Sequence, residues 1–171
     1  MIVIFAVLLA SLAMAQPPAP VNSPQQYGFK VPDASVSLTA GSTETLTVSQ
    51  PAGPKRTVAM YRAVAQCNAN AFLVTQAQNG TDATATAATI VSLNPQQISV
   101  LPLAKAWTAS NVGTGTAVEV PLGGAGGFPM VLDLTPISLP QNSPNINYSI
   151  TIKNNGSGTD TCSLSVQWFE Q

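Results

Sequence analysis

The sequence predicts an all-β protein, organised as a single β-sandwich of immunoglobulin-like or jelly-roll-like architecture with about nine short strands. Short stretches in which apolar and polar residues alternate recur along the chain. Gly, Pro and Asn clusters separate these stretches at spacings typical of all-β domains. No long amphipathic helix pattern follows residue 15. We expect the sandwich to span residues 35–171, preceded by an apolar segment at 1–15 and a proline-rich arm at 16–34.

The clearest strand pattern lies in the C-terminal stretch Asn147–Phe169. Tyr148–Ile152 and Cys162–Trp168 each alternate apolar and hydroxyl-bearing residues. Between them, Asn154–Gly158 has a composition that tolerates positive φ. The pattern predicts a β-hairpin with one buried face. Ser35–Thr39 and Thr43–Ser49 likewise predict two strands joined by a tight turn.

The segment Arg56–Cys67 fits either a strand or a helix, because its alanines favour helix. We favour a strand with Cys67 facing inward. The opposite face then carries Val58, Met60 and Val64, a second apolar surface that a neighbouring subunit would cover. The remaining expected strands lie at 71–78, 83–93, 98–103, 116–122 and 130–134.

Few charges and no histidine limit the functions open to this chain. Charged residues make up 8% of the sequence, and the net charge is −1. Catalytic triads with a histidine base and histidine metal sites are excluded. The scattered cations form no basic footprint for nucleic acid. The seven acidic residues are dispersed and interpreted as surface solvation. We expect no enzymatic activity, no cofactor and no metal.

Two cysteines, Cys67 and Cys162, are the only ones in the chain. If the protein is exported, an oxidising compartment favours a disulfide between them. The alternative is two buried free thiols.

The N-terminal segment 1–15 resembles a signal peptide. It is apolar, ends in Ala13-Met14-Ala15, and is shorter than an ordinary membrane span. We expect cleavage after Ala15, which leaves Gln16 as the new N-terminus. The alternative is a retained apolar helix, packed inside a filament as in pilins or seated in a membrane.

Five prolines, at 17, 18, 20, 24 and 32, make the arm extended. One interpretation is a plain linker. The other is an arm that reaches a neighbouring subunit by strand addition, with four apolar candidates for the contact. These are Val21, Tyr27, Phe29 and Val31.

Three sequons give candidate glycosylation sites at Asn79, Asn147 and Asn155. Asn155 falls on the expected turn of the C-terminal hairpin. Asn147 shares the expected outward face with Ser149 and Thr151. A low-charge surface suits a protein that packs against its own copies or carries glycans.

Together, the export-like start, the proline-rich arm, the Thr/Ser-rich β-domain and the possible bridge resemble the β-sandwich subunits of prokaryotic surface filaments, with archaeal pili and thread-like filaments closest in style. The resemblance implies a structural, extracellular or cell-surface subunit. It would polymerise with copies of itself through its N-terminal segment and apolar β-faces. It would meet a membrane only through residues 1–15, if they are kept.

Two other functions fit the same pattern. A secreted adhesin or carbohydrate-binding module would be a monomer with an exposed aromatic patch around Trp107, whereas Tyr148 and Trp168 are expected in the core. A virion coat or spike protein would use a similar sandwich.

Overall fold

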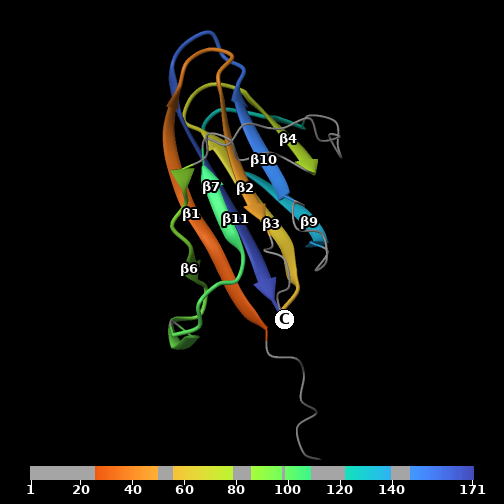
Figure 1. The fold of residues 1–171 in the computed structure, drawn as a ribbon. Helices are drawn as coiled ribbons and strands as arrows, with labels where there is room; N and C mark the ends of the chain where they lie inside the picture. Colours follow the sequence, from red (N-terminus) through yellow and green to blue (C-terminus); the bar gives the residue numbers. More distant parts are fainter. Residues whose placement is uncertain (1–25, 50–55, 79–85, 98, 109–121, 140–146) are drawn as a thin grey trace, which may run out of the picture.

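Two antiparallel sheets packed face to face form a β-sandwich, which confirms the predicted fold class (Figure 1). The structure is a computed structural model. It describes residues 26–49, 56–78, 86–97, 99–108, 122–139 and 147–171.

One sheet has five strands and the other has six. The five-stranded sheet runs in the order β6 (Val91–Ser92), β1 (Tyr27–Leu38), β11 (Asp160–Glu170), β3 (Val58–Cys67) and β9 (Met130–Leu139). The six-stranded sheet runs in the order β5 (Thr86–Ala87), β7 (Lys105–Thr108), β2 (Thr43–Ser49), β10 (Asn147–Asn154), β4 (Phe72–Gln78) and β8 (Leu122–Gly124). A short 3₁₀ helix, η1 (Pro95–Gln97), lies between β6 and β7.

Four connections cross from one sheet to the other at a single end of the sandwich. They join β1 to β2, β3 to β4, β8 to β9 and β10 to β11, and we call residues 39–42, 68–71, 125–129 and 155–159 the arch end. Figure 1 shows these arches together at the top. Backbone hydrogen bonds link them, including Gly41 N to Asn154 O and Asn155 N to Ala71 O, both 2.9 Å.

The predicted C-terminal hairpin is therefore wrong. The predicted tight turn between β1 and β2 is present, with Ser42 N donating to Thr39 O over 3.0 Å, but it joins strands of different sheets. β10 pairs with β2 and β4, while β11 pairs with β1 and β3. An alternating pattern with a Gly/Asn turn suits strands of facing sheets equally well, since both point their apolar side chains into one core. Buried Asn154 fixes the arch: its Nδ2 donates to Leu38 O and Gly158 O, and its Oδ1 accepts from Gly156 N.

A β-bulge changes which residues of β3 face the core. Arg62 lies opposite Gln167 and Met60 opposite Trp168, so Tyr61 is an extra residue on β3. Val58 and Met60 are fully buried, like Ala63, Ala65 and Cys67 farther along the strand. The predicted second apolar face of Val58, Met60 and Val64 is wrong, because the bulge turns the first two inward. Half-buried Val64 alone lies on the outer face.

β1 begins at Tyr27 and crosses the expected boundary between arm and domain at residues 34/35. Its register against β11 shifts between Val31 and Ala34, next to Pro32, where a missing N–H is tolerated. Phe29 and Val31 are only 1% and 2% exposed. The Phe29 ring lies 6.2 Å from that of Trp168, between ring centroids. Both residues are thus part of the protein's own core, which corrects their assignment to a free arm.

Candidate functional site

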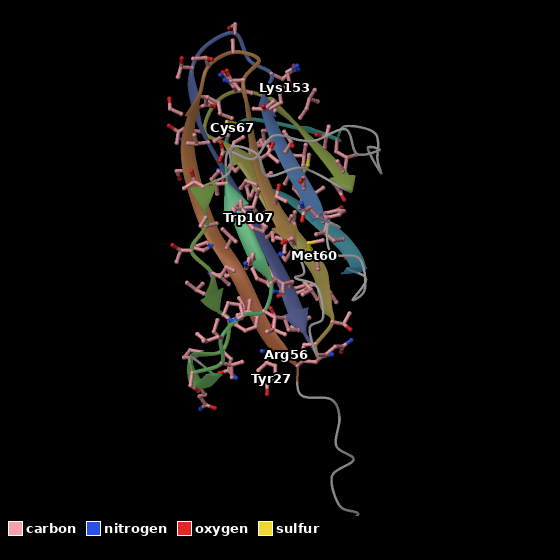
Figure 2. All side chains as sticks on the ribbon, in the orientation of Figure 1. Tyr27, Arg56, Met60, Cys67, Trp107 and Lys153 are labelled. Atoms are coloured by element: carbon pink, nitrogen blue, oxygen red, sulfur yellow. A yellow bond between two sulfur atoms is a disulfide. The ribbon has the colours of Figure 1, made fainter. Side chains whose placement is uncertain are left out.

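The chain enters and leaves the described domain side by side, at the end opposite the arches. Gln26 Nε2 donates to Gln171 Oε1 over 3.0 Å, and Thr57 and Gln171 exchange two backbone hydrogen bonds. Tyr27 pairs with Glu170 at the first position of β1. We call this region, residues 26–27, 56–57 and 170–171, the terminal end. Figure 2 shows Tyr27 and Arg56 there, far from Cys67.

A buried carboxylate organises the terminal end. Glu170 is fully buried, and its oxygens accept from Leu103 N and Ala104 N at 2.9 Å and from Trp168 Nε1 at 3.3 Å. Arg56 NH1 lies 3.3 Å from Glu170 Oε2. The interpretation of all acidic residues as surface solvation is wrong for Glu170. Its spacing gave a signal, because Glu170 continues the inward-facing series of Val166 and Trp168 in steps of two.

Arg56 extends this cluster to the first strand and to the loop before β7. Its NH2 donates to Leu101 O over 3.2 Å. Its guanidinium carbon lies 5.0 Å from the centroid of the Tyr27 ring, within cation–π range. Tyr27 is half-buried against the core. Arg56 therefore connects Tyr27, at the start of the first strand, to Glu170 of the last strand and to Leu101 in the loop before β7.

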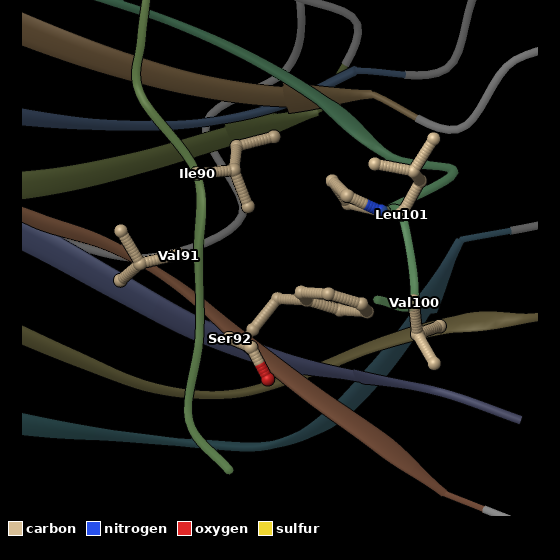
Figure 3. Close-up of a pocket in the computed structure, with 7 residues that line it drawn as sticks. Ile90, Val91, Ser92, Val100 and Leu101 are labelled. Atoms are coloured by element: carbon tan, nitrogen blue, oxygen red, sulfur yellow. The ribbon is translucent and has the colours of Figure 1, made fainter. Parts of the chain in front are cut away.

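An apolar pocket of about 320 Å³ opens beside the terminal end, since Leu101 in its lining accepts a hydrogen bond from Arg56. Figure 3 shows the lining residues. It is lined by Phe29, Ile90, Val91, Ser92, Val100, Leu101 and Pro102. Leu101 is 77% exposed. The one hydroxyl, that of Ser92, donates to Asn94 O. The other described lining residues are apolar, so the pocket suits an apolar side chain. Sequence periodicity could not predict the pocket, because it forms between short irregular segments.

The two cysteines form the predicted disulfide near the arch end. Cys67 and Cys162 lie directly opposite each other on β3 and β11, and both are fully buried. Asp160 lies close to both sulfur atoms. Since the sulfurs are bonded to each other, they offer no thiolate to a metal ion.

Asp160 instead ties two arches together. Its Oδ2 accepts from Ala69 N and Asn70 N at 2.8 and 2.7 Å, and its Oδ1 accepts from Thr161 N. The hydrogen bonds from Asn70 and Ala69 hold the pKa of this carboxyl below its usual value, against a smaller opposing effect of burial.

The sequons differ in exposure. Asn155 is exposed on the arch between β10 and β11. Asn147 is 8% exposed and Ser149 only 1%, so the outward, water-facing position expected for Asn147 is wrong. Alternation shows which residues share a face, but not whether that face is covered. Asn79 lies outside the described residues.

The hydroxyl-rich face of the six-stranded sheet is buried as well. Thr45 pairs with Thr151 and Thr47 with Ser149 through hydroxyl hydrogen bonds of 2.8 Å. Trp107 lies opposite Thr47 on the neighbouring β7 and is half-buried. Tyr148 and Trp168 are core residues as expected.

Like Asn79, the predicted positions Ala15, Gln16 and Val21 fall outside the described residues. Within the described part of the chain, no helix is long and apolar enough to cross a membrane. Comparisons with family models, curated proteins and solved structures find no match.

Proposed function

We propose that this protein is an extracellular structural subunit that polymerises through its N-terminal segment. The observation that carries the proposal is an apolar pocket close to the point where this segment joins the domain: Gln26 lies at the terminal end, and the pocket opens beside that end. A segment of one copy that binds the pocket of the next forms a heterologous interface, which extends into a filament when it does not close.

The disulfide and the low charge support an exterior location. A buried bridge between strands far apart in sequence is typical of proteins from oxidising compartments. A net charge of −1 gives the subunits little mutual repulsion. Residues 16–25, which would follow the cleaved signal peptide, can span up to about 35 Å when extended. A neighbouring copy receives the segment if its pocket lies within that distance of Gln26.

The apolar pocket is the receiving site in this proposal. It lies next to the terminal end and is lined almost entirely by apolar side chains. Val21, in the segment 16–25 of a neighbouring copy, is an apolar residue of suitable size. The inward-facing residues of β3 take no part, because the bulge places Val58 and Met60 in the core.

The proposal is tested with Leu101→Asp and a matched control, Phe128→Asp. Leu101 and Phe128 are 77% and 72% exposed, so neither change removes core packing. Leu101 lines the pocket, whereas Phe128 lies in the turn before β9. We expect wild type and Phe128→Asp to form filaments visible by electron microscopy, and Leu101→Asp to remain monomeric. Filaments formed equally by Leu101→Asp would rule out the pocket as the joint.

A second variant tests the segment itself. Deletion of residues 16–25 keeps every described strand of the two sheets, the first of which begins at Tyr27, so we expect a folded monomer. Sedimentation velocity then measures polymer loss, and circular dichroism checks the fold. Polymers formed by the deletion variant would overturn a role for the N-terminal segment in assembly.

A further inference from the structure

The apolar pocket offers little hydrogen bonding to a ligand. Among the described lining residues, Ser92 carries the one side-chain hydroxyl, which donates to Asn94 O over 3.0 Å and accepts from Asn94 N over 3.2 Å. In Figure 3, Ile90 lies on one side of the pocket, and Val100 and Leu101 lie on the other. A peptide that enters between them meets apolar side chains. Any backbone N–H that it buries there without a partner costs free energy.

The segment that joins the domain beside this pocket is poor in backbone N–H groups. Prolines occupy positions 17, 18, 20 and 24, so four of the ten residues in 16–25 lack this donor. Such a segment enters an apolar pocket at a lower desolvation cost than an ordinary peptide does. Its proline rings also add apolar surface. The pocket and the segment are therefore matched in chemistry.

Addition of this segment as a strand is poorly suited to the site. β6 is the outermost described strand of the five-stranded sheet, and it consists of Val91 and Ser92 alone. An added strand would have only these residues to pair with, and its prolines would supply few of the N–H groups that a ladder needs. Affinity would therefore come from side-chain contacts rather than from backbone pairing.

We propose that residues 16–25 of a neighbouring copy bind the apolar pocket as a polyproline II helix. This helix has three residues per turn and rises about 3.1 Å per residue. Pro18, Val21 and Pro24 then form one apolar edge at intervals of about 9 Å, and Asn22 lies on a different edge. Because proline presets this conformation, little conformational entropy is lost on binding. The inference rests on the proposed assembly and specifies how the segment is recognised.

The test measures binding of a fluorescent peptide of residues 16–25 to two variants of the full chain, by fluorescence anisotropy. Val21→Asp disables the chain's own segment and leaves the pocket intact, whereas Leu101→Asp places a charge in the pocket lining. We expect the peptide to bind the Leu101→Asp chain at least about tenfold more weakly than the Val21→Asp chain. Circular dichroism checks that both chains are folded.

Peptide variants then identify the edge that enters the pocket. A Val21→Asp peptide should bind at least about tenfold more weakly, since burial of a valine side chain contributes at least that factor. The matched Asn22→Asp peptide carries the same charge on a different edge and should bind within about twofold of the original. Asn22→Pro and Ser23→Pro peptides should also bind within about twofold, because a polyproline II helix uses neither N–H group.

Three results would overturn the inference: no binding of the original peptide, equal binding of the Val21→Asp and Asn22→Asp peptides, or a marked loss of affinity in either proline variant. The last result would indicate strand addition. Filaments in native material without this peptide specificity would overturn the polyproline II mode alone. Specific peptide binding without filaments in native material would instead overturn the structural role alone.

Discussion

Arg56 and Glu170 form an ion pair at the terminal end of the sandwich, with 3.3 Å between NH1 and Oε2. Glu170 is fully buried, while the Arg56 side chain is 23% exposed. The pair connects the last strand to the loop before β7 and, through the Tyr27 ring, to the first strand. The ion pair therefore holds Tyr27 in place, close to where residues 16–25 join the domain.

Glu170→Gln should lower the free energy of unfolding by about 2–4 kcal/mol, because it leaves the Arg56 charge without its buried partner. Denaturant titration measures the change. Lys153→Gln, at an exposed charged side chain, is the control and should change stability by less than about 0.5 kcal/mol. Equal stability of Glu170→Gln and wild type would mean that the ion pair does not hold the terminal end.

Replacing both cysteines, Cys67→Ala with Cys162→Ala, should cost about 2–5 kcal/mol of stability. The bridge closes a loop with a sequence separation of 95, so its loss releases much chain entropy in the unfolded state. Thiol titration of unfolded, unreduced native protein should detect no free thiol. Two thiols per chain in that experiment would contradict the disulfide.

Asp160→Asn should reduce stability at neutral pH but not in strong acid. The folded-state pKa of Asp160 lies below its unfolded value, so the carboxylate stabilises the fold at pH values above the unfolded pKa of about 3.9. This contribution fades as the pH falls through the lower, folded-state pKa. The stability difference between variant and wild type should shrink accordingly in denaturant titrations from pH 7 to strong acid. A difference that stays constant with pH would show that the charge of Asp160 is not involved.

Gly126→Ala should destabilise the arch end, whereas Gly158→Ala should not. A Cβ on Gly126 would clash with Ala69 O, a backbone atom that cannot move aside alone. A Cβ on Gly158 meets nothing within 4 Å. We expect a loss of about 1–3 kcal/mol for the first and less than about 0.5 kcal/mol for the second. Equal melting temperatures of the two variants would contradict the close packing of the β8–β9 turn against the β3–β4 arch.

The sequence predicted the sandwich and the cysteine pair because both depend on local alternation and composition. It could not distinguish a hairpin from an arch between sheets, since Tyr148–Ile152 and Cys162–Trp168 face the core in either arrangement. Long-range contacts, such as the hydrogen bond from Asn154 Nδ2 to Leu38 O, determine which of the two arrangements forms.

The candidate sites were harder to predict for a related reason. One extra residue at Tyr61 reverses the faces of β3, and no local signal marks it. Because of this bulge, Tyr61 and Arg62 are both close to Val131 and Asp133 of β9 on the outer face of that sheet. The burial of Glu170 was predictable in principle, because this residue continues the buried alternation of β11. Charged residues are rarely buried, however, and this favoured a surface position in the sequence analysis.

The most direct test of the structural role is electron microscopy of the native protein, collected from its source without reductant and identified by mass spectrometry. The account predicts filaments in which this chain is the repeating subunit. It also predicts that the Leu101→Asp variant, prepared in the same way, forms no filaments. A uniform population of monomers in the native material would contradict it.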